Sequence, residues 1–330
     1  MRNTEGAKPD RKIAMTHDQM LAKGSIRVTR SARGRISGDG VELAFGYWPG
    51  RSAPTVALHG LTASHLNFIG IAERLAGRCA LLALDLRGRG DSDKPEGPYG
   101  MAQHAHDVAA AMRAMGLGPS IVVGHSMGAF VATALAAQEP ELVSGLVLVD
   151  GGYALAMPST DAPPEQGLGA ALALRISGLR QTYPSRQAYR EFWRTQPHFP
   201  PEEWNPWIEA FLDYEVGGES PVQPKASEAG VRADLMEAFQ RDEINARLKS
   251  IHVPTLLVRA ESGFTRTQPP LFPDAVAEQF RTHLPQVEHH KLAGTTHYTI
   301  VLGEYAAAKI ADLICELDRR LSRHGNKVTA

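Results

Sequence analysis

The sequence has little cysteine, little net charge and no long apolar run. Only two cysteines occur in 330 residues, Cys79 and Cys315, and their spacing matches no metal-binding motif. We therefore expect buried thiols in a reducing compartment. Lysine and arginine number 35 against 36 aspartates and glutamates, so charge gives no reason to expect a nucleic acid or an anionic membrane surface as a partner.

No stretch approaches the roughly 20 apolar residues that a membrane-spanning helix needs. Residues 1–20 carry charges but no apolar core of signal-peptide length. The expected location is therefore the cytoplasm, and the expected partner is a small-molecule substrate. The sequence leaves open whether the chain is a monomer or a homodimer.

From residue 25 onward, short apolar runs alternate with helix-like runs. The apolar runs that follow the first hairpin-like stretch lie near 55–58, 80–84, 121–123, 145–149, 254–259 and 287–292. Such alternation indicates parallel β-α-β units and a sheet with helices on both faces. Ligands of these sheets bind at the carboxyl ends of the strands, where His59, Asp85, Ser126 and Asp150 stand.

The most informative stretch is Gly124-His125-Ser126-Met127-Gly128. It follows an apolar run and leads directly into a helix-like run, which is the strand–turn–helix context of the G-x-S-x-G nucleophile elbow. Glycines on both sides let the strand and the helix approach while the serine adopts a strained backbone conformation. The pattern predicts that Ser126 is a nucleophile held clear of the sheet.

An activated serine needs a base, an orienting acid and donors for the oxyanion. In the chain order typical of this elbow, the histidine base comes last. His297 follows the last expected strand, on a loop that begins with Gly294, and is the predicted base.

Two backbone amides are predicted to hold the oxyanion. Met127 follows the nucleophile, and Leu61 lies in the loop after the strand that ends near Leu58. His59, Gly60 and His125 flank these positions and are the expected substrate contacts in the two loops.

Six motifs in this chain resemble those of the α/β-hydrolase fold superfamily. They are HGLT at His59, DLRGRGDSD at Asp85, GHSMG at Gly124, LVLVDGG at Leu146, PTLLVRA at Pro254 and GTTH at Gly294, and they follow the family order over residues 55–297. The resemblance implies an α/β fold with an eight-stranded, mostly parallel sheet, helices on both faces and a helical cap inserted after strand six. Residues 153–252, where the strand rhythm stops, would be the cap. Residues 25–152 and 253–330 would be the core, and residues 1–24 a flexible arm.

The sequence offers three acids for the triad. The superfamily commonly places an aspartate shortly after strand seven, but here the expected position is occupied by Gly263. Asp150, which closes strand six, is the preferred candidate, and Glu261 is the alternative. Another acid such as Asp274 is the third option.

Two groups have competing interpretations. Trp193, Trp204 and Trp207 either form the small core of the cap or line an apolar substrate slot. The acidic loop from Asp85 to Asp93 resembles a structural loop of the superfamily that internal ion pairs brace. We therefore expect no metal site and no cofactor.

GHSMG together with PTL resembles the bacterial serine carboxylesterases. The expected activity is hydrolysis of a carboxylic ester of a small, partly apolar substrate through an acyl-enzyme. Dehalogenases and epoxide hydrolases of the superfamily use aspartate at the elbow, so Ser126 excludes them. A lactonase, amidase, thioesterase or C–C bond hydrolase would use the same triad, and a receptor-like ligand-binding protein with little turnover is the alternative outside enzymes.

Overall fold

The computed structural model describes residues 32–155 and 176–328, so the expected arm at residues 1–24 lies outside it. At its centre is an eight-stranded sheet with the strand order β1-β2-β4-β3-β5-β6-β9-β10. The strands β1 and β2 run antiparallel to their neighbours, and the others pair in parallel. The predicted eight-stranded, mostly parallel sheet is confirmed. The strands are β1 (Ala32–Ser37), β2 (Glu42–Trp48), β3 (Ser52–Leu58), β4 (Cys79–Leu84), β5 (Ser120–His125), β6 (Val143–Val149), β9 (Thr255–Ala260) and β10 (Val287–Leu292).

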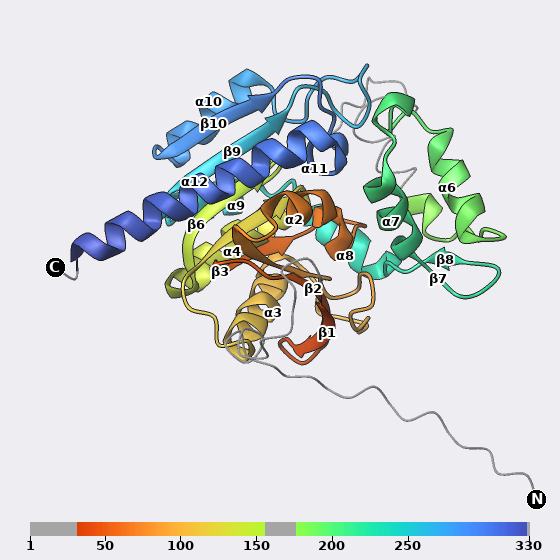
Figure 1. Cartoon of the computed structure of the whole chain (residues 1–330), viewed down its shortest axis with the longest axis horizontal. Helices are drawn as coiled ribbons and strands as arrows, with labels where there is room; N and C mark the ends of the chain where they lie inside the picture. The colour runs from red at the N-terminus through yellow and green to blue at the C-terminus, as the bar shows by residue number, and fades with distance from the viewer. Residues whose placement is uncertain (1–31, 156–175, 329–330) are drawn as a thin grey trace, which may run out of the picture.

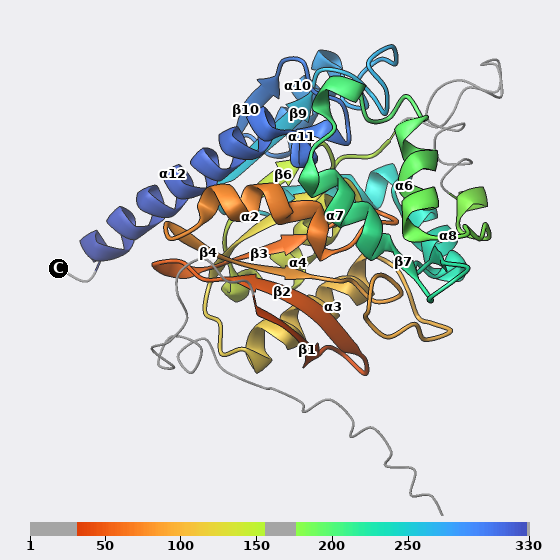
Figure 2. The ribbon, with the colours of Figure 1, turned by 45° about the vertical axis from the view of Figure 1, so that its right-hand side comes forward.

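Helices cover both faces of this sheet (Figure 2). One face carries α2 (Ile69–Leu75), α11 (Thr299–Leu302) and α12 (Glu304–Val328), and the other carries α3 (Met101–Ala114), α4 (Met127–Gln138), α9 (Arg241–Lys249) and α10 (Asp274–His283). The central strands β4 and β5 are buried at every residue, because parallel strands present both of their faces to helices. The core is accordingly split into two hydrophobic clusters, one on each side of the sheet.

Among the described residues between β6 and β9, helices predominate over strands, as predicted for an insertion after strand six. This segment contains α6 (Arg186–Arg194), α7 (Pro206–Glu215) and α8 (Glu228–Glu237), and α6 and α7 pack against each other beside the sheet in Figure 1. Side chains of Ser185, Asn205 and Ser227 accept hydrogen bonds from first-turn amides and so start these three helices. A two-stranded ribbon, β7 (Val216–Gly217) with β8 (Gln223–Pro224), was not expected from the sequence.

The bounds of the insertion stay a prediction. The helix α9 falls within the expected cap residues but packs against α4 and α10, on the face of the sheet that α3 also covers. Three short 3-10 turns complete the described elements: η1 (His65–Phe68), η2 (Pro140–Leu142) and η3 (Pro201–Glu203). Of the helices in the described ranges, none combines the length and the apolar character that crossing a bilayer requires.

Candidate active site

Ser126 stands at a sharp turn between β5 and α4. Its backbone has φ 54° and ψ −119°, which is a strained conformation for a residue other than glycine. The two flanking glycines make this turn possible. A Cβ on Gly124 would lie 2.2 Å from the Gly128 carbonyl oxygen, and a Cβ on Gly128 would lie 1.9 Å from that of Leu58. The local geometry is the elbow that the sequence predicts.

His297 and Asp150 form a buried pair. The His297 Nδ1 lies 2.6 Å from the Asp150 Oδ2, and the two side chains are 5% and 0% exposed. The other oxygen, Asp150 Oδ1, accepts a hydrogen bond from the Ala260 amide at 3.1 Å. Because both oxygens have donors, the carboxylate is fixed in position and can orient the imidazole with Nε2 directed away from it.

The other two acids considered from the sequence have different partners. Glu261 is exposed and accepts a hydrogen bond from the Gly294 amide at 2.8 Å, in the loop that leads to His297. Asp274 is exposed and pairs with Arg259 at 2.9 Å. The structure therefore brings Asp150 to the histidine, while Glu261 braces the histidine's loop.

His125 contacts the loop that carries His297. Its Nε2 lies 2.9 Å from the His297 carbonyl oxygen, and its Nδ1 lies 2.9 Å from the Asn67 Oδ1. Burial lowers the pKa of His125 well below its ordinary value, so the ring is neutral at physiological pH. Through these contacts His125 helps to position His297. His125 also lines the pocket over Ser126, so its expected role as a substrate contact stays a prediction.

A pocket opens over Ser126 and the His297–Asp150 pair. It measures about 810 Å³ including its mouth, and Ser126, His297 and Asp150 all line it. Leu61 and Met127, whose amides are the predicted oxyanion donors, line it as well, as does Gly60. A Cβ on Gly60 would come within 3.3 Å of the Ser126 Cβ, so glycine keeps this wall close to the nucleophile.

His59 does not line the pocket. It is fully buried, donates from Nδ1 to the Gly60 carbonyl at 2.7 Å and accepts from the Leu86 amide on Nε2 at 3.0 Å. Burial lowers the pKa of His59 to about 4, with Asp85 opposing that shift. Its expected substrate contact is therefore wrong, because the ring points into the protein and ties two loops together.

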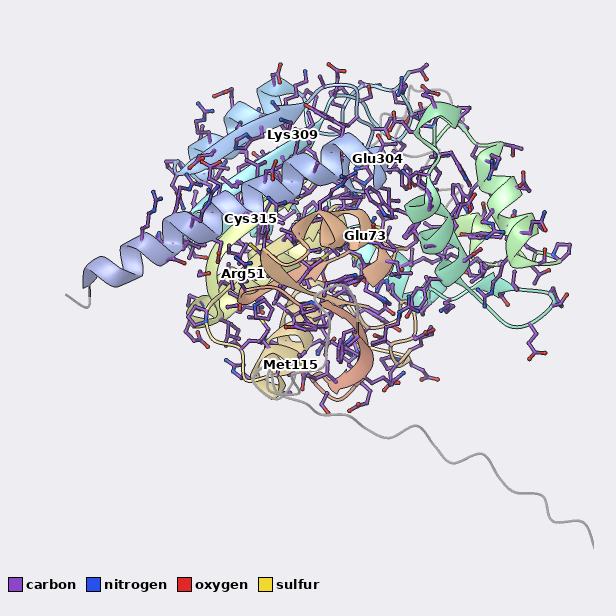
Figure 3. All side chains as sticks on the ribbon, viewed as in Figure 1. Arg51, Glu73, Met115, Glu304, Lys309 and Cys315 are labelled. Carbon is purple, nitrogen blue, oxygen red and sulfur yellow. The ribbon has the colours of Figure 1, made fainter. Side chains whose placement is uncertain are left out.

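The three tryptophans also lie away from the pocket. Trp193 packs edge-on against Tyr189 and Phe192 inside the helical segment. Trp204 donates to Glu209, and Trp207 donates to Glu73 at 2.9 Å, across to α2, where Glu73 is labelled in Figure 3. None of the three lines the pocket over Ser126, so the expected substrate contact is not found there. Trp193 packs within the helical segment, as the alternative interpretation expects, whereas Trp207 packs against α2.

Several pocket residues were missed by the sequence analysis. Most are apolar: Met101, Phe130, Leu155, Phe211, Leu235, Ala238, Phe264, Leu271, Phe272 and Tyr298. The ring of Phe264 stacks edge-on against His297 with centroids 4.8 Å apart. The aromatic richness of the helical segment was the available signal for Phe211. Nothing in the local sequence pointed to Asp234, a buried acid of α8 that also lines the pocket.

Asp85, which follows the last residue of β4, has structural partners. Asp85 accepts hydrogen bonds from the His65 side chain at 2.9 Å and from the Tyr214 hydroxyl at 2.6 Å. Burial alone would raise the pKa of Asp85, but hydrogen bonds and nearby histidines outweigh it and lower that pKa below its ordinary range. Within residues 32–155 and 176–328 no cluster of three His, Cys, Asp or Glu side chains is arranged to hold a metal ion.

Comparison with known proteins places this geometry in a family. The 2-(acetamidomethylene)succinate hydrolase of Mesorhizobium japonicum is 29% identical over 245 residues, which are 73% of this chain and 80% of that protein. The N-formylmaleamate deformylase of Pseudomonas putida is 31% identical over 151 residues, which are 46% of this chain and 54% of that protein. A crystal structure of E-2-(acetamidomethylene)succinate hydrolase covers 87% of this chain and 100% of that one, with a TM-score of 0.72 at 24% identity, and so shares its fold.

The sequence matches the alpha/beta hydrolase fold family over residues 54–304. That range runs from β3 through the elbow, the helical insertion and the loop that carries His297 to the first residue of α12. With a match over most of its length, the chain belongs to the α/β-hydrolase fold family.

Proposed function

We propose that this protein is a serine hydrolase that cleaves a carboxylic ester of a small, partly apolar substrate through an acyl-enzyme. The observation that carries the proposal is the shared pocket: a nucleophile elbow at Ser126 opens into the same cavity as the buried His297–Asp150 pair. A nucleophile, a base and an orienting acid are the minimum set for acyl transfer.

In the proposed first step, His297 takes the proton of the Ser126 hydroxyl as Oγ attacks the ester carbonyl carbon. The amides of Leu61 and Met127 hold the oxygen that becomes negative, and Asp150 stabilises the imidazolium. His297 then protonates the leaving alcohol. In the second half, His297 takes a proton from water as the water oxygen attacks the acyl-enzyme. His297 then returns this proton to Ser126 Oγ as the bond to the acid breaks and the acid leaves.

The pocket walls support an uncharged, partly apolar acyl group. The described lining residues include no lysine and no arginine, and their charged side chains are Asp150 and Asp234, each already paired. A substrate carboxylate would therefore find no cationic partner on these walls and would lose its hydration on entry.

Amide hydrolysis is the second candidate. The two curated relatives are named for 2-(acetamidomethylene)succinate and N-formylmaleamate, whose names place an acyl group on nitrogen. The same serine, histidine and oxyanion donors would serve such a bond. A p-nitroanilide with the same acyl chain as the best p-nitrophenyl ester separates the two activities.

The deciding experiment compares wild type with Ser126→Ala on p-nitrophenyl esters of short and medium chain length. We expect the variant to fold and to lose at least about 10³-fold in kcat, because the covalent route is closed. A folded Ser126→Ala protein with the wild-type rate would overturn the proposal. Labelling of wild type by an organophosphonate, without turnover of any ester, would show working serine machinery directed at another bond.

A further inference from the structure

The loop after β4 contains two buried arginines with different partners. The Arg87 Nε lies 2.6 Å from Asp107 Oδ2, on α3 of the sheet's helical layer. The Arg89 Nη2 lies 2.6 Å from Asp234 Oδ2, on α8 of the insertion after β6. Both Arg89 and Asp234 are fully buried. A single loop thus makes one ion pair to the core and one to the inserted helices.

Arg89 also contacts both residues of the proposed oxyanion hole. Its Nε–H donates to the Leu61 carbonyl oxygen at 3.0 Å, and its Nη2 lies 3.7 Å from the Met127 sulfur. A third contact, from Nη1 to the Arg87 carbonyl at 3.0 Å, anchors the guanidinium to its own loop. Because a guanidinium is planar and rigid, any shift of its Asp234 end moves the Nε–H that holds Leu61.

Asp234 is itself firmly held. Its Oδ1 accepts from the Gly100 amide at 2.6 Å, and its Oδ2 accepts from His104 Nε2 at 2.9 Å as well as from Arg89. Burial would raise the pKa of this carboxyl, but the charge of Arg89 and the His104 hydrogen bond keep it below its ordinary value. The acid is therefore ionised, as a buried partner of an arginine must be.

The helix that carries Asp234 also walls the pocket. Leu235 and Ala238 line the cavity beside it, and the Ala238 carbonyl accepts from the Leu155 amide at 2.9 Å. The position of α8 thus bears on the pocket wall and, through Asp234 and Arg89, on the Leu61 backbone.

We propose that Arg89 is a positioning residue that links α8 to the oxyanion hole, so that the rate of catalysis depends on the position of the Asp234 carboxylate. The inference rests on the proposed function, because it concerns the donors of that mechanism. Arg89 does not touch the substrate. It holds the Leu61 peptide in the orientation that directs the Leu61 amide toward the developing charge.

The test compares Asp234→Asn with Asp107→Asn in the full-length protein. Each substitution neutralises the buried acid partner of one arginine of the same loop, and only the first acts on the residue that holds Leu61. Loss of a whole oxyanion donor lowers kcat by about 10²–10³-fold. For a displaced donor we expect about a 10–100-fold lower kcat in Asp234→Asn, with KM within about 3-fold. Asp107→Asn is expected to keep kcat within about 3-fold.

Inhibition by a transition-state analogue distinguishes a displaced oxyanion donor from a general loss of order in the active site. Ser126 Oγ adds to a trifluoromethyl ketone, its proton passes to His297, and the ketone oxygen becomes an oxyanion in the hole. The inhibition constant of this ketone should weaken in Asp234→Asn by about the factor lost in kcat/KM. Inhibition by the corresponding alcohol, which forms no oxyanion, should stay within about 3-fold.

Two further variants keep the proposal testable if Asp234→Asn fails to fold. Arg89→Lys retains the buried charge pair but lacks the Nε–H, so it should fold and be about as slow as Asp234→Asn. The double variant Arg89→Met with Asp234→Leu removes both charges, and buried pairs often tolerate such replacement. It should fold and remain slow.

The proposal is overturned if Asp234→Asn and Asp107→Asn lose kcat equally, or if the double variant recovers the wild-type kcat. Either result would mean that charge balance, and not the hold on Leu61, matters. These outcomes are distinct from failure of the proposed function, which would appear as a wild-type rate in Ser126→Ala.

Discussion

Ser126 and Asp150 are the two non-glycine residues with positive φ in the part of the chain that the structure describes, at 54° and 46°. Side chains other than glycine rarely adopt this conformation, and where it occurs the surrounding structure holds it in place. Ser126 is held by the elbow glycines. Asp150 is held by its amide, which donates to the Val258 carbonyl at 2.8 Å, and by its contact with His297. Strain therefore falls on the two residues to which the proposed mechanism assigns the nucleophile and the acid.

The first residue-scale prediction distinguishes the two acids. Asp150→Asn keeps the shape of the side chain but removes the charge that stabilises the His297 imidazolium, so kcat should fall by about 10³–10⁴-fold. Glu261→Gln should stay within about 3-fold, because Glu261 accepts a single exposed hydrogen bond from Gly294. Steady-state rates on one p-nitrophenyl ester, with circular dichroism as the folding control, measure both. The reverse ranking would assign the acid to Glu261.

The second prediction concerns His59 and acid stability. Its folded pKa of about 4 lies below the ordinary value of 6.5, so between these values the unfolded chain binds more protons than the folded one. Stability therefore rises with pH in this window and is lost as the pH falls. The protonated ring would also place an N–H against the Leu86 amide, which now donates to it.

From the pKa difference, His59 should lower the free energy of unfolding by about 2 kcal/mol between about pH 7.5 and about pH 5. Urea unfolding at the two pH values measures this for wild type and for His59→Gln. The variant should lack that part of the pH dependence, whatever its stability at neutral pH. His125 contributes in the same direction in both proteins and cancels in the comparison. Equal pH dependence in the two proteins would contradict the assignment.

At the scale of elements, much of the fold could be predicted because each signal was local. Near neighbours in the chain are enough to interpret the apolar runs of strand length and the pair of glycines at 124 and 128. The triad acid, in contrast, could not be chosen from near neighbours in the chain. The choice depends on β6 pairing with β9, which places Ala260 next to Asp150, and no local pattern reports that register. The predicted substrate contacts of the tryptophans were not found for a similar reason, because aromatic content does not show which side of a helix faces the pocket.

The elbow itself gives the element-scale prediction. A methyl group on Gly128 would overlap the Leu58 carbonyl, so Gly128→Ala must push α4 away from β3. We expect a loss of more than about 2 kcal/mol of unfolding free energy together with loss of esterase activity. Gly118→Ala is the matched control: it is exposed, has no atom within 4 Å of an added Cβ, and should change stability by less than about 0.5 kcal/mol. Equal Cm values in urea for the two variants would refute the steric argument.

At the scale of the whole molecule, the two cysteines that are far apart in the sequence are neighbours in space. Cys79 begins β4, and Cys315 lies on α12, labelled in Figure 3 where that helix crosses the sheet. Their sulfur atoms are 2.9 Å apart, both are free, and both side chains are buried. Contact with Cys315 lowers the pKa of Cys79 to about 7, so a fraction of it is thiolate, the form that attacks disulfides. The expected burial of both thiols is confirmed, and their contact could not be predicted from the sequence because 236 residues separate them.

We therefore predict that oxidised glutathione converts the pair to a disulfide. Cys79 thiolate attacks one glutathione sulfur and releases one reduced glutathione. Cys315 then attacks the mixed disulfide and releases the second, so the protein loses two hydrogen atoms. The bond would close a loop of most of the chain, and disulfides typically add about 2–4 kcal/mol to the free energy of unfolding. Mass spectrometry detects the loss of two hydrogen atoms, and urea unfolding with and without dithiothreitol measures the gain in free energy of unfolding.

Cys315→Ser is the control and should show neither effect. A stable mixed disulfide on Cys79 in wild type, with no loss of hydrogen, would mean that the two sulfurs do not meet.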